Sequence, residues 1–566
     1  MRIDCVRFYA QRIYNFDHLI ALVSGLVVAL LWCHNYISFL DGSVFPKWML
    51  LFTACSIISV ALSIKLYFIK PMISTCWHEI IAVVLFVMMA GIVSLRADFV
   101  KVILIACSSI TLYLLGKYWW AKVRQTCLCA AIFVGIITIA SLFWNIMNGR
   151  FQTIVFFENT VHTSLNLCLS FIALIESFAS LYNRILRWLY LSLIVIIFAV
   201  TFFIGSRVGV MVEIGTLMIF FIKRNNLSRY ILIGLIIASP LLIAYKWNSS
   251  MGRLFIYRTA ITMLDTPKNI LIGRGENGFR RDYMVHQAQK LENQTHEIRQ
   301  RADSIHHPLN ELLSLAIDYG IICVILFVAA IWSLMSGGIL SSLQISAFLA
   351  IVAFSCVTYP FRYPESWIII CLLLGSINKK GIKKVKFLSG RYISMGLICI
   401  GIFTCYQVFA VSLLHLKWTK ACNYMSIGCF DDARNIYEDI GKDLSTPEYK
   451  YNYASALLRM GLPFEAWNII SQCVVVNYDV MMLKGNIAKS CGLMNDAIKS
   501  YTLAHKMCPN RFIPMIELYN IYYYQCDWEQ ARIIGMSILK KDVKIPSEKI
   551  SQGIMEVKKS LKTIDK

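Results

Sequence analysis

Basic and imidazole side chains gather in one polar stretch of the chain, from Trp247 to Asn310, which separates two hydrophobic regions. Two arginines open this stretch, a third lies in its glycine-rich middle and two adjacent histidines lie near its end. These residues are Arg253, Arg258, Arg274, His306 and His307. Guanidinium groups offer paired donors that match phosphate oxygens, and an imidazole can accept a proton near neutral pH. The pattern therefore favours a site that binds an anionic substrate and moves a proton.

A fourth arginine, Arg207, follows Gly205 and Ser206 between two hydrophobic spans. An arginine at the edge of a membrane is costly unless it is paired or faces a polar cavity, so Arg207 is also a functional candidate. Each candidate has an ordinary alternative: a snorkelling arginine at 207, surface charge at 253 and 258, and a structural role for the histidines.

The middle of the stretch, from Gly273 to Phe279, has the look of a dinucleotide-binding glycine loop, but no βαβ unit surrounds it. A turn that contacts the substrate or a lid fits better. The two adjacent histidines have no further ligands at metal-binding spacing, so we expect neither a metal nor a cofactor.

The composition indicates what must position these residues. The chain has 566 residues, of which 58% are hydrophobic and 16% charged, and its mean hydropathy is +0.61. Apolar runs reach the roughly 18 residues that a helix needs to cross a bilayer. A polytopic, all-α membrane protein is expected. The net charge of +22 fits positively charged loops on the inner side of a membrane, and no nucleic-acid-binding module is present.

About 12 to 13 hydrophobic spans follow from these runs, and the one at 364–377 is the least certain. The predicted spans are Leu19–Leu40, Trp48–Ile69, Glu79–Leu95, Phe99–Gly116, Cys127–Met147, Thr163–Leu181, Trp188–Ile204, Val208–Ile222, Tyr230–Tyr245, Leu309–Ser333, Leu343–Tyr359, Pro364–Ile377 and Ile393–Leu414. Lysine and arginine are about three times as frequent in alternate connections, which sets the N-terminus inside. The 247–310 stretch and everything after Leu414 then face outward.

The C-terminal part changes character to soluble helical repeats. A glycine or cysteine precedes an alanine by five residues at Gly428/Ala433, Gly461/Ala466, Gly492/Ala497 and Cys526/Ala531. The alanines recur at close to the 34-residue period of tetratricopeptide repeats, which build an α-solenoid. We therefore expect a membrane domain over 1–415, a repeat domain over 417–541 that serves as a protein-docking surface or spacer, and a polar tail over 542–566.

The order of these motifs resembles the O-antigen ligase superfamily. The motifs are Ser206-Arg207 at an outer helix end, Gly252-Arg253 before an aromatic residue and Arg258, the glycine turn, and His307-Pro308-Leu309-Asn310-Glu311 before Asp318 and Gly320. That superfamily contains lipopolysaccharide O-antigen ligases, O-antigen polymerases and bacterial O-oligosaccharyltransferases. The similarity covers about Leu19–Ile377, and a subset of the superfamily carries C-terminal tetratricopeptide repeats.

The resemblance implies a metal-independent glycosyltransferase of the bacterial inner membrane, with the large loop and the repeats in the periplasm. Arg207 and Arg253, aided by Arg258 and Arg274, would bind the pyrophosphate of an undecaprenyl-linked glycan donor. His307 would deprotonate the acceptor, and Asn310 would position a substrate. Relatives commonly have a histidine directly before the asparagine, where this chain has Leu309, so His306 and His307 both remain candidates for the base.

Within this class, three acceptors remain open: lipid A–core, a growing glycan, or a protein hydroxyl. A transporter of lipid-linked glycans and a non-catalytic scaffold are the other classes. A transporter predicts charges at the bilayer midplane and symmetry between two halves. The spans hold few acidic residues, and a scaffold leaves the loop arginines unexplained.

Overall fold

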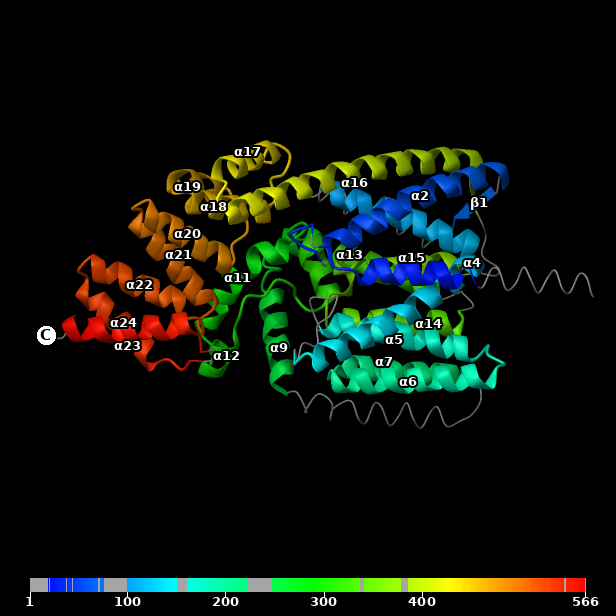
Figure 1. Ribbon diagram of the computed structural model, residues 1–566, viewed down its shortest axis with the longest axis horizontal. Helices are drawn as coiled ribbons and strands as arrows, with labels where there is room; N and C mark the ends of the chain where they lie inside the picture. Colours follow the sequence, from blue (N-terminus) through cyan, green and yellow to red (C-terminus); the bar gives the residue numbers. More distant parts are fainter. Residues whose placement is uncertain are drawn as a thin grey trace, which may run out of the picture.

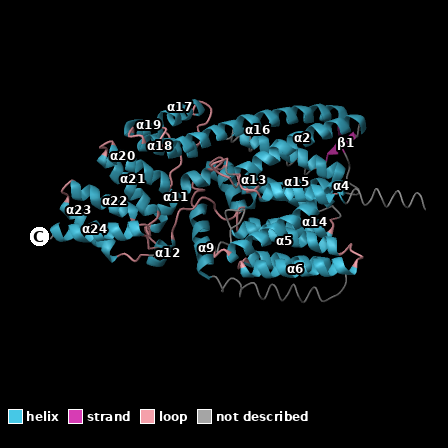
Figure 2. Cartoon of the chain, viewed as in Figure 1, coloured by secondary structure: helices cyan, strands magenta, loops and turns pink. Residues whose placement is uncertain are grey.

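The computed structural model describes residues 19–69 except 20, 37 and 43, and then 72–75, 99–149, 160–221, 247–335, 340–377, 385–543 and 546–564. Most of these residues lie in helices (Figure 2). The described part also contains one antiparallel two-stranded ribbon, β1 (Met72–Thr75) with β2 (Val385–Ser389). The helical prediction is confirmed apart from this ribbon. Two predicted spans, Glu79–Leu95 and Tyr230–Tyr245, lie outside the described residues.

The apolar helices form a bundle at one end of the molecule (Figure 1). They are α2 (Phe45–Ile69), α4 (Phe99–Met147), α5 (Thr160–Phe178), α6 (Arg184–Phe203), α7 (Arg207–Phe221), α13 (Glu311–Met335), α14 (Ser342–Ser355), α15 (Pro364–Ser376) and α16 (Gly390–Ile427). Six helices among the described residues are long and apolar enough to cross a membrane. Shorter apolar helices cover Ala21–Cys33, Ser342–Ser355 and Pro364–Ser376.

Burial differs sharply between the helices of this bundle. In α5, every residue from His162 to Ile175 is buried, so this helix lies at the centre. In α6, large apolar side chains such as Trp188, Val195 and Phe202 are exposed. Contiguous apolar exposure of this kind is rare on soluble proteins and suits contact with lipid. The bundle is therefore built as a membrane protein would be.

The structure alters four of the predicted spans. The first ends at Cys33 instead of Leu40. The spans Phe99–Gly116 and Cys127–Met147 lie in α4 on either side of a kink at Trp119, where the backbone leaves helical geometry. The span predicted from Leu309 begins at Glu311 and is interrupted at Gly320.

Gly320 shows why the chain breaks there. Its φ of 84° favours glycine, and a Cβ at this position would lie 2.1 Å from the carbonyl oxygen of Leu271. The short helix α10 (Pro267–Ile272) packs against α13 at this point. The polar stretch is thus folded onto the start of α13.

The polar stretch is itself mostly helical, which the sequence did not predict. It contains α9 (Trp247–Ile261), α10, α11 (Gly278–Leu291) and α12 (His296–Arg301). Its apolar side chains do not repeat at helical spacing along a long window, so periodicity gives little signal here. We call residues 247–310 the outer segment.

The predicted repeats are pairs of antiparallel helices. After α16 they comprise α17 (Phe430–Ile440), α18 (Pro447–Arg459), α19 (Pro463–Ser471), α20 (Tyr478–Ser490), α21 (Met494–Met507), α22 (Ile513–Tyr524) and α23 (Trp528–Lys540). The recurring Gly428, Gly461, Gly492 and Cys526 all have positive φ and occupy the turn between two helices. The alanines that follow them are fully buried, which lets the helices pack closely. The sequence pattern therefore marks turns and helix contacts.

Two boundaries differ from the prediction. The break expected between residues 415 and 417 falls inside α16, which continues from the bundle into the first repeat (Figure 1). Residues 542–566 were expected to form a polar tail. Within them, α24 (Glu548–Ile564) packs Val557 and Leu561 into the last repeat. Only one face of α24 is apolar, so most of its residues are polar and its composition does not reveal that it packs against the repeats.

The outer segment and the repeats share one hydrophobic core. Met263, Phe279 and Met284 of the outer segment lie in the same buried cluster as Trp418 and Met507 of the repeats. Helix α11 lies against α21, and buried Gln287 donates hydrogen bonds of 3.0 and 2.9 Å to the carbonyl oxygens of Asp303 and Met507. The two parts therefore form one body, which must lie on a single side of any membrane that the bundle spans.

Candidate functional site

Arg253 is the centre of the candidate anion site. It is partly buried on α9, and no hydrogen bond or ion pair reaches it from the described residues. Ser250, Arg253 and Tyr257 follow one another at helical spacing and share one face of α9. Arg207 is the first residue of α7, and its Nη1 lies 3.5 Å from the Ser250 hydroxyl oxygen. The two predicted arginines thus meet at one face of one helix.

The pKa of Arg253 reflects this environment. Burial lowers the pKa of Arg253 from its ordinary value, the Tyr257 phenol opposes that shift, and the positive charge of Arg207 adds to it. Two guanidinium groups repel each other when they lie close, and an anion between them relieves that repulsion. The pair is suited to bind a doubly charged group such as a pyrophosphate.

Tyr257 connects this face of α9 to the segment that carries the histidines. Its hydroxyl lies 3.0 Å from the carbonyl oxygen of Leu309 and 3.3 Å from that of Cys356, and it can donate its one proton to either. The Asn310 side chain donates to the same Cys356 carbonyl at 3.1 Å. Asn310 Oδ1 also accepts from the backbone N–H of Leu313 at 2.9 Å, which caps α13. Asn310 therefore orders the protein backbone.

Leu309 is held in an unusual conformation within that segment. Its φ is 55°, in the left-handed region that costs a non-glycine residue roughly 1–2 kcal/mol. Such a conformation persists when its surroundings fix it, and here Tyr257 and Asn310 hold the backbone on either side of Leu309. Leu309 is thus a strained position beside the candidate site.

His307 pairs with an arginine that the sequence did not single out. Arg362, in the turn between α14 and α15, places Nη1 2.6 Å from His307 Nε2. The His307 ring also stacks on Tyr359, with ring centres 4.4 Å apart. Because a guanidinium has only donors, Nε2 must be the acceptor, and the ring proton lies on Nδ1. His307 is therefore neutral, with Nδ1–H as its donor.

Positive charge also surrounds this histidine. Burial lowers the pKa of His307 well below its ordinary value, and Arg362, Arg280, His306 and His162 lower it further. Burial and these cations therefore favour the neutral form of the ring.

Arg274 has a different environment from Arg253. Its Nε donates to the Met263 carbonyl oxygen at 2.7 Å, and its two terminal nitrogens pair with Asp282 at 3.0 Å and Asp265 at 2.7 Å. These contacts join α10, α11 and the preceding turn. The geometry favours a structural role for Arg274 over the predicted contact with substrate.

The other two predicted residues lie at the surface. Arg258 is exposed, and none of the described residues pairs with it. His306 is exposed next to His307 and lies near Arg280 and Asp479 of the repeats. The structure therefore groups Arg207 with Arg253, and it places His307 and Asn310 on the adjoining segment.

Three aromatic or imidazole residues near this segment were missed from the sequence. His162 is fully buried near the start of α5. The centre of its ring lies 4.1 Å from that of Tyr363 and 5.0 Å from that of Tyr359. Neither of its ring nitrogens has a hydrogen-bond partner among the described residues. Arg362, Tyr359 and Tyr363 come from the sequence YPFRY, between two helices. One proline and three aromatic residues in so short a turn were the available signal.

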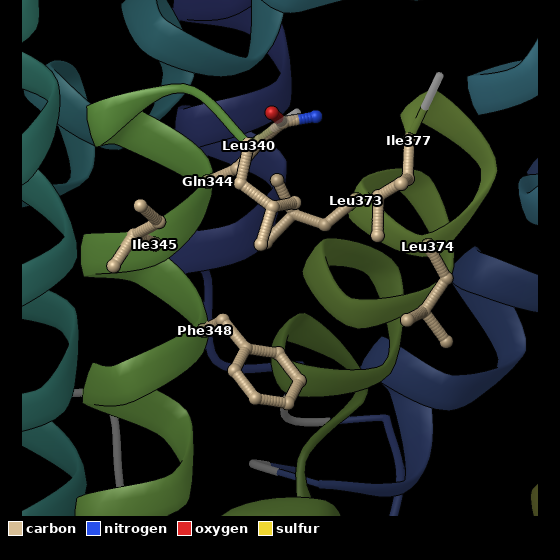
Figure 3. A pocket seen from close by; sticks show the side chains of 7 residues that line it. All are labelled: Leu340, Gln344, Ile345, Phe348, Leu373, Leu374 and Ile377. Atoms are coloured by element: carbon tan, nitrogen blue, oxygen red, sulfur yellow. The ribbon is translucent and has the colours of Figure 1, made fainter. Parts of the chain in front are cut away.

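A small pocket lies elsewhere, between α14 and α15 (Figure 3). It is lined by Leu340, Gln344, Ile345, Phe348, Leu373, Leu374 and Ile377. These residues belong to the start of α14 and the end of α15, away from the turn that carries Arg362. Gln344, its one polar side chain, donates to Ser376 at 2.7 Å. This apolar pocket is separate from the candidate site.

Comparisons with known proteins give little further information. No protein-family model matches the chain, and no curated protein matches it. Among solved structures, the chain is similar to yeast Tom70, with 10% sequence identity and a TM-score of 0.25 over 81% of this chain and 92% of that chain. A TM-score this low supports no argument, so fold and site rest on the residues and contacts of the chain itself.

Proposed function

We propose that this protein transfers a glycan from undecaprenyl pyrophosphate to an acceptor hydroxyl at the outer face of a bacterial inner membrane. In this proposal the outer segment and the repeats face the periplasm. The observation that carries it is the partly buried Arg253, beside Arg207 and without a carboxylate partner among the described residues. A buried cation without an acidic partner is costly unless a ligand supplies the negative charge.

The reaction fits these cations. The acceptor oxygen forms a bond to the anomeric carbon while the bond from that carbon to the pyrophosphate oxygen breaks. The bonding electrons leave with the pyrophosphate, so negative charge on it grows in the transition state. Arg207 and Arg253 then stabilise the transition state more than the bound substrate, which is what accelerates a reaction. The lipid pyrophosphate already activates the sugar, so no nucleotide is required.

A deletion strain tests the proposal. We expect loss of a surface glycan, restored by the wild-type gene but not by Arg253→Ala at equal membrane abundance. Loss of long chains from lipopolysaccharide would indicate a ligase, shortening to one unit a polymerase, and loss of glycoproteins a protein transferase. Unchanged glycans after deletion, or full restoration by Arg253→Ala, would contradict it.

A transporter of lipid-linked glycan is the alternative from another class. The purified protein distinguishes the two when it is mixed in detergent with donor and acceptor, where no membrane separates the compartments. A transferase forms a new glycosidic bond under these conditions, whereas a transporter forms none.

A further inference from the structure

We propose that His307 is a hydrogen-bond donor to a phosphate oxygen of the substrate, held in place by Arg362, and that it is not the base. This inference rests on the proposed function and assigns the residue that the family resemblance makes a proton acceptor. It begins from the 2.6 Å contact between Arg362 Nη1 and His307 Nε2.

The first step concerns the lone pair. A general base accepts the substrate proton through an unprotonated ring nitrogen within hydrogen-bond reach. In neutral histidine only one nitrogen has that lone pair, and here it is Nε2, which Arg362 already occupies. A guanidinium cannot be deprotonated in a protein, so it cannot exchange roles with the imidazole. The nitrogen that a base would need is therefore taken.

The second step concerns the other nitrogen. Nδ1 carries the proton and has no hydrogen-bond partner among the described residues. Arg362, Arg280, His306 and His162 all disfavour a charged ring, the Tyr359 ring stacks on it, and none of these groups is a carboxylate. An N–H donor in such a positive environment suits an anionic oxygen better than a hydroxyl. The phosphate can come from the lipid donor or from a phosphorylated acceptor.

The third step concerns rigidity. His307 stacks on Tyr359, and the backbone that follows it is fixed by the Tyr257, Asn310 and Cys356 contacts. A preorganised donor of this kind stabilises growing negative charge without reorganisation. The acceptor proton then passes to the departing pyrophosphate oxygen, which balances the step without a protein base.

Substitution by glutamine separates the two roles. In His307→Gln, the side-chain amide retains one acceptor for Arg362 and one donor for the substrate, but it cannot act as a base. We expect His307→Gln to keep transfer within about tenfold of wild type and His307→Ala to lose about 10²–10³-fold, the usual effect of removing one such donor. Equal loss in both variants, with normal folding, would overturn the proposal.

Arg362 and pH give independent readouts. Arg362→Lys can still donate to Nε2 and should recover most of the activity that Arg362→Ala loses. The acidic limb of the wild-type pH–rate profile should persist in His307→Gln, since His307 is not the group that titrates. A limb that disappears in His307→Gln would identify His307 as the base and overturn the proposal.

Binding tests the inference even if the proposed function fails. Undecaprenyl pyrophosphate and a phosphorylated acceptor glycolipid are titrated separately onto the full chain in detergent. Weaker binding of either by His307→Ala, with His307→Gln near wild type, supports the donor role and identifies the source of the phosphate. Unchanged binding of both would overturn it. Wild-type binding without any transfer would overturn the proposed function alone.

Discussion

The arginines of the outer segment fall into two groups that the sequence presents as alike. Arg274, Arg280 and Arg281 each pair with a carboxylate, from Asp265, Asp282 or the repeat residue Glu448. Arg253, on α9, has no such pair within the described residues. Net charge counts both groups equally. The carboxylate partners distinguish the two groups: arginines that have them stabilise the fold, whereas Arg253 lacks a counter-ion among the described residues.

The largest expected effect of this difference is on catalysis. Arg253→Ala should lower glycan transfer by about 10²–10³-fold, because it removes one preorganised cation from the leaving pyrophosphate. Its thermal unfolding should stay close to wild type, since no protein carboxylate among the described residues loses a partner. Arg253→Lys should recover only part of the rate, because a lysine lacks the paired donors. A rate near wild type for Arg253→Ala would remove the distinction between the groups.

The paired group should show the opposite result. Arg274→Ala leaves the Met263 carbonyl without its side-chain donor and removes one of the two arginines that pair with Asp282, at a cost of roughly 1–3 kcal/mol in the free energy of unfolding. Transfer per folded molecule should change little. Thermal unfolding and transfer, measured on one preparation, check both halves. A large loss of transfer without destabilisation would restore Arg274 to the substrate site.

A buried glutamine, Gln287, also stabilises the fold, because it joins the outer segment to the repeats. Gln287→Ala leaves two carbonyl oxygens unpaired at a buried site, which should cost about 1–3 kcal/mol. The matched control is Gln300→Ala, because Gln300 is a surface residue whose contact with Asp542 is 3.4 Å long. Faster proteolysis of the outer segment in the first variant only is expected. Equal behaviour of both would indicate that the repeats do not stabilise this segment.

This shared core changes how a deletion of the repeats should be interpreted. From the sequence, the repeats look like a separate docking surface or spacer, and their removal would leave an enzyme with residual activity. In the structure, Met263, Phe279 and Met284 would lose their packing against Trp418 and Met507. Loss of activity after such a deletion would therefore not distinguish a scaffold from an enzyme.

What the sequence predicts well depends on local signals. The glycines at 428, 461 and 492 predicted the repeat period, which recurs because a left-handed turn favours glycine at one fixed position of each repeat. The apolar runs predicted helices because their length and composition suffice. Arg207 and Arg253 were chosen from charge next to apolar spans, and the structure brings these two residues close together.

What the sequence could not predict depends on pairing over distance. Arg362 and His307 are 55 residues apart, and only the fold brings them together. Arg274 and Arg253 differ in their partners, although both follow a glycine in a basic stretch. The outer helices carry apolar faces that pack against the repeats, so their stability comes from another part of the chain.

Acid should affect the paired group first. Burial raises the pKa of Asp282, but hydrogen bonds and charge from Arg281 and Arg274 outweigh that effect and hold it below its ordinary value of 3.8. A carboxyl whose pKa is lower when folded contributes stability above its ordinary pKa, and that stability is lost as pH falls through the folded value. Stability of wild type should therefore drop below about pH 4. Asp282→Asn should be less stable at neutral pH and lose less on acidification, as pH-dependent thermal unfolding will show.

The smallest effect is expected at Arg258, five residues after Arg253 on α9. Five residues correspond to a rotation of about 140° around a helix, so the two side chains point to different sides. Arg258 is also exposed, where loss of a charge usually changes energies by less than about 0.5 kcal/mol. Arg258→Ala should thus keep transfer within about threefold, from RT of roughly 0.6 kcal/mol. A loss as large as that of Arg253→Ala would mean that the substrate wraps around α9, and exposure and helix face would then no longer decide which of the arginines without a carboxylate partner bind it.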